Sequence, residues 1–170
     1  APVIVGWAAT VVTVNEPDSP RVATPADAAT MAELLDAFNR EYGEPSPGPA
    51  ALADRLTDLL SRSSTFAIVA GDPITSLGLV TIRTNVWVDG GIALLDEMYT
   101  TPAQRSRGLG GAVLTAAVAE AARRGAGEFE IEVDEPDVDA HRFYARHEFP
   151  LRDPETGDRA FVLRKELTAP

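Results

Sequence analysis

A basic, glycine-rich turn between an apolar strand and an apolar helix constrains this chain more than any other feature. The turn, at residues 104–112, follows a strand-like run at 92–99 and opens a helix-like run at 112–122. Glycines let backbone N–H groups approach a phosphate, the helix N-terminus carries a partial positive charge, and Arg105 and Arg107 add full charges. The arrangement predicts a pyrophosphate site, although two glycines at this spacing also mark ordinary tight turns.

The order of predicted elements indicates a mixed α/β fold. Strands are expected at 21–24, 65–70, 76–88, 92–99 and 128–133, from Phe149 and at 159–167, and helices at 26–42, 50–62, 112–124 and 137–147. Antiparallel hairpins come first and a crossover helix follows the glycine turn, so we expect a mixed, mostly antiparallel twisted sheet with helices on both faces. We expect one domain over residues 1–170, with a strand-like extension at 1–16 and a core at 21–167.

Composition and charge narrow the function classes. The absence of cysteine excludes disulfides, thiolate metal sites and a cysteine nucleophile. A net charge of −11 disfavours nucleic acid and anionic membranes as partners, and it suits a cationic substrate or simply keeps the protein soluble. His141 and His147 lack partners at metal-ligand spacing, so no metal is expected. No apolar run is long enough to cross a bilayer and the first residues lack a signal peptide's positive region, so a cytoplasmic location is expected.

Two motifs resemble those of the GCN5-related N-acetyltransferase (GNAT) family. Arg105-x-x-Gly108-x-Gly110 fits the family pattern Arg/Gln-x-x-Gly-x-Gly/Ala. Further along, Asp137-x-x-Ala140-x-x-Phe143-Tyr144-x-x-x-Glu148-Phe149 is similar to Asn-x-x-Ala-x-x-Leu-Tyr-x-x-x-Gly-Phe. The two motifs occur in the family's order and separation, and the resemblance covers residues 21–167.

The second motif departs from the family at two positions. Asp137 stands where asparagine is usual, and its carboxylate can still cap the helix by accepting backbone N–H groups. Glu148 stands where glycine is usual. Because glycine's freedom at positive φ is lost there, we expect a different turn into the next strand.

The resemblance implies acetyl-CoA as co-substrate and direct transfer of its acetyl group to an amine. It implies that the pyrophosphate lies on the turn and that the end of the preceding strand, with Asp137, contacts the amide-bearing arm. The implied cofactor-binding residues are Met98, Tyr99, Thr100, Arg105, Arg107, Gly108, Gly110, Gly111, Asp137 and Tyr144. The Met98 N–H is the implied oxyanion donor.

Three residues carry the implied proton transfers. Tyr144 matches the family's tyrosine near the departing thiolate and would be the general acid, since a phenol stays protonated at neutral pH. Asp96 and Glu97 are adjacent, so in a regular strand only one of them can face the acceptor. We favour Glu97 as the base and Asp96 as an acceptor contact. Either could instead attract a cationic substrate or pair with an arginine.

Three functions stay open at this level. The first is an N-acetyltransferase acting on a small-molecule amine. The second is an enzyme that acetylates a protein N-terminus or lysine, and the third is a non-catalytic acyl-CoA-binding sensor. A homodimer is expected, because the strand-like segment at 1–15 could add an edge strand or exchange with a partner chain.

Overall fold

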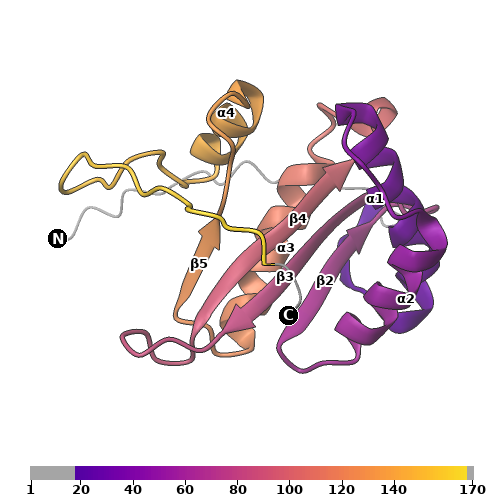
Figure 1. Ribbon diagram of the computed structural model, residues 1–170, viewed down its shortest axis with the longest axis horizontal. Helices are drawn as coiled ribbons and strands as arrows, with labels where there is room; N and C mark the ends of the chain where they lie inside the picture. The colour runs from indigo at the N-terminus through magenta and orange to yellow at the C-terminus, as the bar shows by residue number, and fades with distance from the viewer. Residues whose placement is uncertain (1–17, 168–170) are drawn as a thin grey trace, which may run out of the picture.

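The computed structural model describes residues 18–167, whose centre is one five-stranded sheet (Figure 1). Its strands are β1 (Arg21–Val22), β2 (Thr65–Ala70), β3 (Ser76–Arg83), β4 (Ile92–Thr100) and β5 (Glu128–Ile131), and they lie in that order across the sheet. Neighbouring strands are antiparallel except β4 and β5, which are parallel. The predicted mixed, mostly antiparallel sheet is confirmed, while the predicted extension at 1–16 lies outside the described residues.

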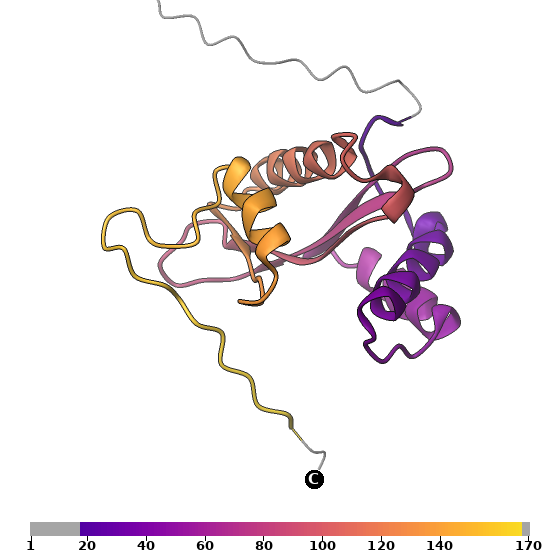
Figure 2. The same cartoon turned by 90° about the horizontal axis from the view of Figure 1, so that it is seen from above.

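Helices cover both faces of the sheet (Figure 2). The helices are α1 (Ala28–Tyr42), α2 (Pro49–Leu60), α3 (Leu109–Arg123) and α4 (Val138–Arg146), and short 3-10 turns occur at Pro25–Asp27 and Pro102–Gln104. Figure 2 shows α1 and α2 on one side of the sheet and α3 on the other. Within residues 18–167, no helix is long and apolar enough to cross a membrane.

Two hydrophobic cores sandwich the sheet, because side chains of a strand alternate between its faces. On β2, Ala67 and Val69 pack in the cluster under α1 and α2. Phe66 and Ile68 pack in the cluster under α3. The continuous apolar run of β2 is therefore a strand buried on both faces, and we refer to these faces below as the α1/α2 face and the α3 face.

The α4 helix begins as the sequence predicts and ends differently. The Asp137 carboxylate accepts the Ala140 N–H at 2.9 Å, which confirms the predicted N-cap. Glu148 adopts φ +67°, the left-handed conformation that glycine would take. The expectation of a different turn is therefore wrong. The chain keeps the turn and places a glutamate in it, at a cost of about 1–2 kcal/mol in backbone strain.

We predict that Glu148→Gly stabilises the protein. Relief of the left-handed strain exceeds the extra flexibility that glycine gives the unfolded chain, so the free energy of unfolding should rise by about 0.5–1 kcal/mol. Urea denaturation followed by circular dichroism measures this change. Glu148→Ala removes the same charge without relaxing the backbone, so it should give no gain. Equal stabilisation by both variants would show that the charge matters and the turn does not.

The predicted strand at 159–167, which we call the C-terminal arm, is not formed. Figure 2 shows the chain after α4 running away from the body. Phe161 is 74% exposed and Leu163 is 93% exposed. A strand needs a hydrogen-bonded neighbour, and within residues 18–167 the arm has none. No strand begins at Phe149 either, although its ring packs against Phe129 with centroids 5.8 Å apart.

Candidate functional site

The carboxylates of Asp96 and Glu97 lie on the same face of the sheet. The β3–β4 register shifts between Leu79, which pairs with Glu97, and Val80, which pairs with Leu95, so Asp96 is the extra residue of a β-bulge. Leu79 packs in the α1/α2 cluster, and its cross-strand partner Glu97 points the same way. The expectation of a regular strand, whose adjacent side chains point to opposite faces, is therefore wrong here.

A hydrogen bond from the neighbouring strand fixes the second carboxylate. Thr81 lies two residues after Leu79 on β3, and its hydroxyl donates to the Asp96 carboxylate at 2.6 Å. Ala93, Leu95 and Met98 of β4 pack in the α3 cluster, so the two residues between Leu95 and Met98 are displaced together to the opposite face. The residue types of β4 do not indicate a bulge, and a regular strand was therefore expected.

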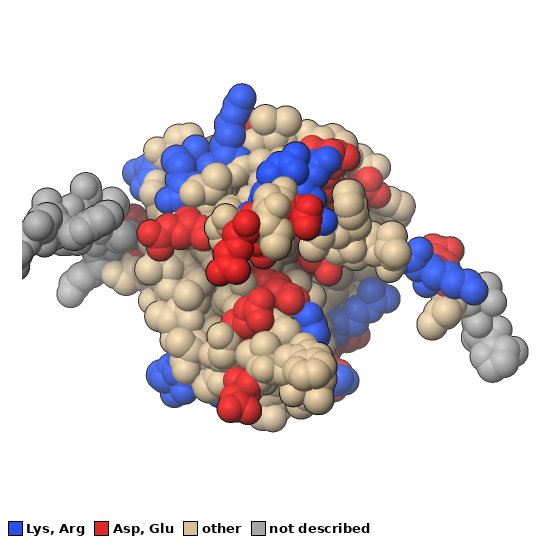
Figure 3. Space-filling view, turned by 90° about the vertical axis from the view of Figure 1, so that its left-hand side faces the viewer, with Lys and Arg blue, Asp and Glu red and all other residues tan. Residues whose placement is uncertain are grey.

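Burial, together with a smaller effect of neighbouring negative charge, raises the pKa of both carboxyls. For Glu97 the larger cause is burial and the second is the charge of Asp96. For Asp96 burial again leads, the Thr81 hydrogen bond opposes it, and the charge of Glu132 just beyond β5 adds to it. Figure 3 looks at the side on which β5 lies and shows acidic side chains gathered across its middle. The α1/α2 face of the sheet therefore carries two carboxyls with raised pKa values, and the acidic side chains nearby favour a cation.

The pairing of β4 with β5 stops just before this site. The last paired residues are Leu95 and Ile131, whereas β4 continues to Thr100. Figure 1 shows the two strands diverging from this point. Over residues 96–100, the edge of β4 that faces β5 has no strand partner within residues 18–167. The Thr100 carbonyl accepts a hydrogen bond from Arg105, and the other backbone groups on that edge are available to an extended ligand.

The glycine turn presents a set of free backbone donors. Gly108 is the N-cap of α3 with φ +84°, and Ser106 has φ +60°. The first bond of the helix runs from the Ala112 N–H to the Gly108 carbonyl, so the N–H groups of residues 109–111 have no partner inside the helix. No side chain caps this end within the described chain. The Arg107 guanidinium contacts Gln104 at 2.6 Å and is otherwise exposed at the turn.

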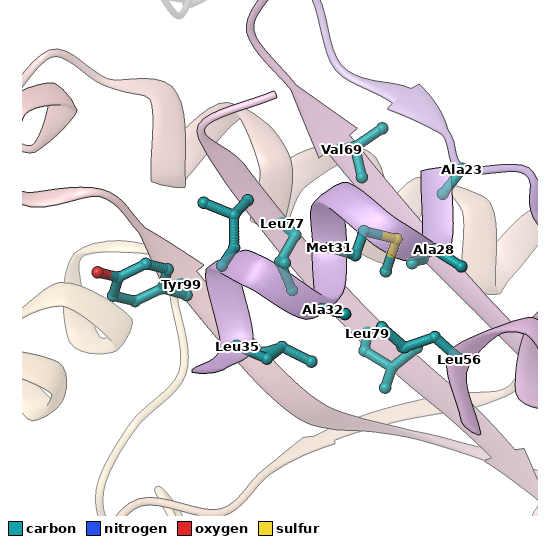
Figure 4. Close-up of a cluster of buried hydrophobic side chains, with 12 residues drawn as sticks. Ala23, Ala28, Met31, Ala32, Leu35, Leu56, Val69, Leu77, Leu79 and Tyr99 are labelled. Atoms are coloured by element: carbon teal, nitrogen blue, oxygen red, sulfur yellow. The ribbon is translucent and has the colours of Figure 1, made fainter. Parts of the chain in front are cut away.

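The Arg105 side chain joins the glycine turn to α1 and β4. Its guanidinium forms two hydrogen bonds to the Glu41 carboxylate, at 2.6 and 2.7 Å, and donates to the Thr100 carbonyl at 2.9 Å. Tyr99 also donates to Glu41, at 3.0 Å. Figure 4 shows Tyr99 at the edge of the α1/α2 cluster with its hydroxyl pointing away from the other labelled side chains. This network ties α1 to the end of β4 through the Arg105 side chain.

Tyr144 approaches the free edge of β4 from α4. Its hydroxyl lies 3.8 Å from the Met98 sulfur, and its ring packs edge-on against Phe143 with centroids 5.1 Å apart. Burial, with a smaller contribution from the charge of Asp137, raises the pKa of Tyr144 to about 12. The phenol is therefore protonated throughout the physiological range and can act only as a proton donor there.

Gly110 lies where three elements meet. A Cβ at this position would be 3.3 Å from the Thr100 hydroxyl oxygen, 3.4 Å from the Met98 methyl carbon and 3.8 Å from the Phe143 ring. One position thus touches the end of β4 and the face of α4 that carries Tyr144. At Gly111 a Cβ would come within 2.9 Å of the His147 ring, so this glycine allows the α3 and α4 ends to pack closely.

Hydrogen bonds hold the loop between α1 and α2 against α1. The Ser46 hydroxyl donates to the buried carboxylate of Asp36 at 2.6 Å, and the Gly48 N–H donates to Ser46 at 3.1 Å. The Asn39 amide donates to the Pro45 carbonyl at 2.8 Å. Sequence reasoning missed the structural roles of Asp36 and Glu41, since a carboxylate on a helix gives no sign of its partner.

Residues 18–167 contain no cluster of three side chains suited to a metal ion.

Comparison with protein families gives one clear result. The model of the "Acetyltransferase (GNAT) family" matches residues 30–149, which include the glycine turn, both carboxylates and the α4 motif. No curated protein matches the chain.

Solved structures share the fold. A proposed acetyltransferase from Arthrobacter sp. FB24 is 41% identical, with a TM-score of 0.82 over 91% of this chain and 99% of that chain. AAC(6')-Iy, in complex with the bisubstrate analogue CoA-S-monomethyl-acetylneamine, is 15% identical with a TM-score of 0.68 over 88% of this chain and 98% of its own. An aminoglycoside acetyltransferase from an uncultured soil metagenomic sample, in complex with sisomicin, is 16% identical with a TM-score of 0.66 over 86% and 96%.

Proposed function

Because the chain belongs to the GNAT family of acetyltransferases, we propose that it moves the acetyl group of acetyl-CoA directly to a primary amine of a small molecule. The observation that carries the proposal is the meeting of three elements at one point. Gly110 lies against Met98 and Phe143, and Tyr144 reaches the same methionine from α4. The donors of the glycine turn, the free edge of β4 and a protonated phenol are thus within reach of one extended ligand.

The residues present fit acetyl-CoA. Its pyrophosphate needs several convergent donors, and the free N–H groups at 109–111 supply them at the positive end of α3. Gly108 permits the left-handed conformation that aims them, and the Arg107 guanidinium adds charge. On the edge of β4 that faces β5, the backbone at Met98, Tyr99 and Thr100 would hold the pantetheine arm, and Asp137, the N-cap of α4, is the proposed contact for its amide groups. Bound acetyl-CoA would supply the acetyl group as a thioester.

The acceptor amine must lose a proton before it attacks. Glu97 is the proposed base, because burial and the neighbouring charge raise its pKa and so strengthen it as a proton acceptor. Asp96, held by Thr81, faces the same side and is placed to attract a cationic amine. The bulge makes these roles compatible, since both carboxylates can act on one substrate.

The departing thiolate must gain a proton and the carbonyl oxygen must be stabilised. Tyr144 is the proposed general acid, and the Met98 N–H is the proposed oxyanion donor. The hydroxyl of Tyr144 lies beside the Met98 side chain, which brings the two roles to one stretch of β4. Arg105 would act indirectly, by holding the end of β4 against Glu41 of α1.

The acceptor is proposed to be a small cationic amine. The raised-pKa carboxylates and the fastened loop between α1 and α2 suit a compact, positively charged substrate. The solved structures with bound CoA-S-monomethyl-acetylneamine and sisomicin are consistent with that size and charge. Acetylation of a protein N-terminus or lysine is the alternative within the enzyme class. A sensor that binds acyl-CoA without turnover is the alternative outside it.

Calorimetric titration with acetyl-CoA, followed by a free-thiol assay against a panel of amines, tests the proposal. Binding with thiol release on one class of small amines is the expected result. Thiol release only with peptides would favour the protein acetyltransferase. Binding without turnover on any amine would favour the sensor, and no binding would overturn the assignment of the glycine turn.

We predict that kcat/KM rises with pH and that the ionisation of Glu97 sets the acid limb of this pH profile. Because the base must be deprotonated and its pKa is raised, activity should be low on the acid side and increase as pH passes above the ordinary glutamate value of about 4.3. Asp96→Asn removes a neighbouring charge that raises this pKa, so the limb should move to lower pH. Glu97→Gln should abolish the limb. A limb that stays unchanged in Glu97→Gln would show that another group, such as the amine, sets it.

A further inference from the structure

The His147 side chain reaches the start of α3 from the end of α4. His147 is the C-cap residue of α4, and a Cβ added at Gly111 would lie 2.9 Å from its Cε1 and 3.0 Å from its Nε2. These two atoms form the outer edge of the imidazole ring. Turning the ring over exchanges them, so Nε2 lies at this edge in either orientation. A ring nitrogen therefore faces Gly111 at the start of the helix.

The ring edge lies on the side of α3 to which the free backbone donors point. The Cα–Cβ direction of a helical residue is tilted toward the helix N-terminus, so the ring edge that a Cβ at Gly111 would meet lies in that direction. The N–H groups of residues 109–111, which have no partner inside the helix, also point toward the N-terminus. A phosphate that accepts these N–H groups would therefore lie on the same side of α3 as the imidazole edge.

Packing and a backbone hydrogen bond hold the ring in this position. The half-buried imidazole packs against the Phe143 ring, with centroids 4.8 Å apart and an angle of 52° between the planes. The His147 N–H donates to the Tyr144 carbonyl at 2.9 Å, and the left-handed Glu148 turns the chain directly afterwards. A side chain held in this way loses little conformational freedom when it binds a ligand.

The charge around the glycine turn and α4 also suits a phosphate. Arg107 of the turn and Arg142 and Arg146 of α4 are exposed. Figure 3 shows basic side chains gathered in the upper part of the side that it views, and Figure 1 places α4 in the upper part of the molecule. The positive charge here would attract an anion, whereas the acidic middle of the same side would attract a cation.

We propose that His147 is a further acetyl-CoA-binding residue, and that its imidazole donates a hydrogen bond from Nε2 to the pyrophosphate held by the start of α3. This inference rests on the proposed function, because it needs acetyl-CoA on the glycine turn. An imidazole with a proton on Nε2 is a donor whether it is neutral or charged, and the charge of a phosphate oxygen strengthens the bond. The bond would join the bound co-substrate to α4, the helix that carries Tyr144.

Calorimetric titration with CoA and with 3′-dephospho-CoA tests the contact without relying on turnover. His147→Phe keeps an aromatic ring against Phe143 and removes both ring nitrogens. Its dissociation constant for CoA should rise about tenfold, as expected for the loss of one hydrogen bond to a charged group. The same loss is expected with 3′-dephospho-CoA, which keeps the pyrophosphate. His147→Gln supplies an amide N–H in place of Nε2 and should restore most of the affinity.

His141 of the same helix provides the matched control and simplifies a second readout. Its Nε2 lies 3.0 Å from the Asp134 carbonyl oxygen, so His141→Gln should bind CoA as the wild type does. The chain has two histidines, and this variant therefore leaves His147 as the source of the histidine ring signals in an NMR spectrum. Saturation with CoA should shift the ring nitrogen resonances of His147.

The outcomes distinguish this inference from the proposed function. No binding of CoA by the wild type would overturn both. Wild-type binding with an unchanged dissociation constant in His147→Phe, or with unshifted His147 ring signals, would overturn this inference alone. A loss seen with CoA and absent with 3′-dephospho-CoA would place the contact at the 3′-phosphate, which also contradicts it. Equal losses in His147→Phe and His147→Gln would show that the imidazole acts only by packing.

Discussion

Replacing Gly110 with tryptophan should abolish acetyl-CoA binding, with a loss of at least about 100-fold in affinity, or ~2.7 kcal/mol. A Cβ added at this position would lie 3.3 Å from Thr100 and 3.4 Å from Met98. An indole ring would therefore fill the junction of β4, α3 and α4. The ring would also cover the free N–H groups at the start of α3. Calorimetric titration measures the loss directly.

Two further variants distinguish a blocked binding site from an unfolded protein. Gly110→Ala adds only a methyl group whose neighbours are side chains that can shift by a few tenths of an ångström, and alanine favours the helix by about 1 kcal/mol. This variant should fold and bind within about fivefold of the wild type. Thr115→Trp places the same indole side chain at an exposed position of α3, and this variant should bind normally. Normal binding by a folded Gly110→Trp would show that the ligand does not approach this turn.

Local sequence signals predicted most of the elements because each signal acts over a few residues. The apolar run of β2 gave the strand at Thr65–Ala70, and the spacing of leucines and alanines gave α1 and α2 nearly to their ends. Asp137 was predicted as a cap, and its carboxylate accepts the Ala140 N–H. The strand predicted at 76–88 is shorter and ends at Arg83, since the loop that follows has no strand partner in the described chain.

Features that depend on a partner distant in the sequence were not predictable. The bulge at Asp96 arises from the mismatch between β3 and β4, and nothing in β4 alone reveals it. The pairing of Arg105 with Glu41 joins residues 64 positions apart. The C-terminal arm has the apolar pattern of a strand, but a strand also needs an edge to pair with. The sequence of a segment indicates whether it favours a strand. Whether the strand forms depends on pairing with another part of the folded chain.

Glu148 illustrates a local rule overridden by its surroundings. Loss of glycine argued for a new turn, yet the backbone takes φ +67°. The Phe149 N–H donates to the Tyr144 carbonyl at 3.1 Å, and the Phe149 ring packs on Phe129. These contacts outweigh about 1–2 kcal/mol of strain and keep α4, with its tyrosine, against β4.

Removing the phenol of Tyr144 should slow turnover and leave acetyl-CoA binding intact. Tyr144→Phe keeps the ring against Phe143 and loses only a long contact, 3.8 Å, to the Met98 sulfur, so the fold and the cofactor affinity should change little. General acid catalysis contributes about 10²–10⁴-fold to a rate. A thiol has a pKa of about 8.5, so its thiolate departs readily and needs less help than an alkoxide. We therefore expect a fall in kcat near the lower limit, about 100-fold.

The raised pKa of Tyr144 gives this prediction a second readout. With the pKa raised to about 12, the wild-type phenol stays protonated up to pH 10, so the wild type should show no alkaline loss of activity from this group below that pH. Tyr42→Phe, which removes an exposed hydroxyl on α1, is the matched control and should leave kcat unchanged. Normal turnover by Tyr144→Phe would contradict the acid role and assign the proton to water. A fall in kcat matched by lost acetyl-CoA binding would assign Tyr144 to binding, because a group that acts only as an acid is needed in the transition state and not before it.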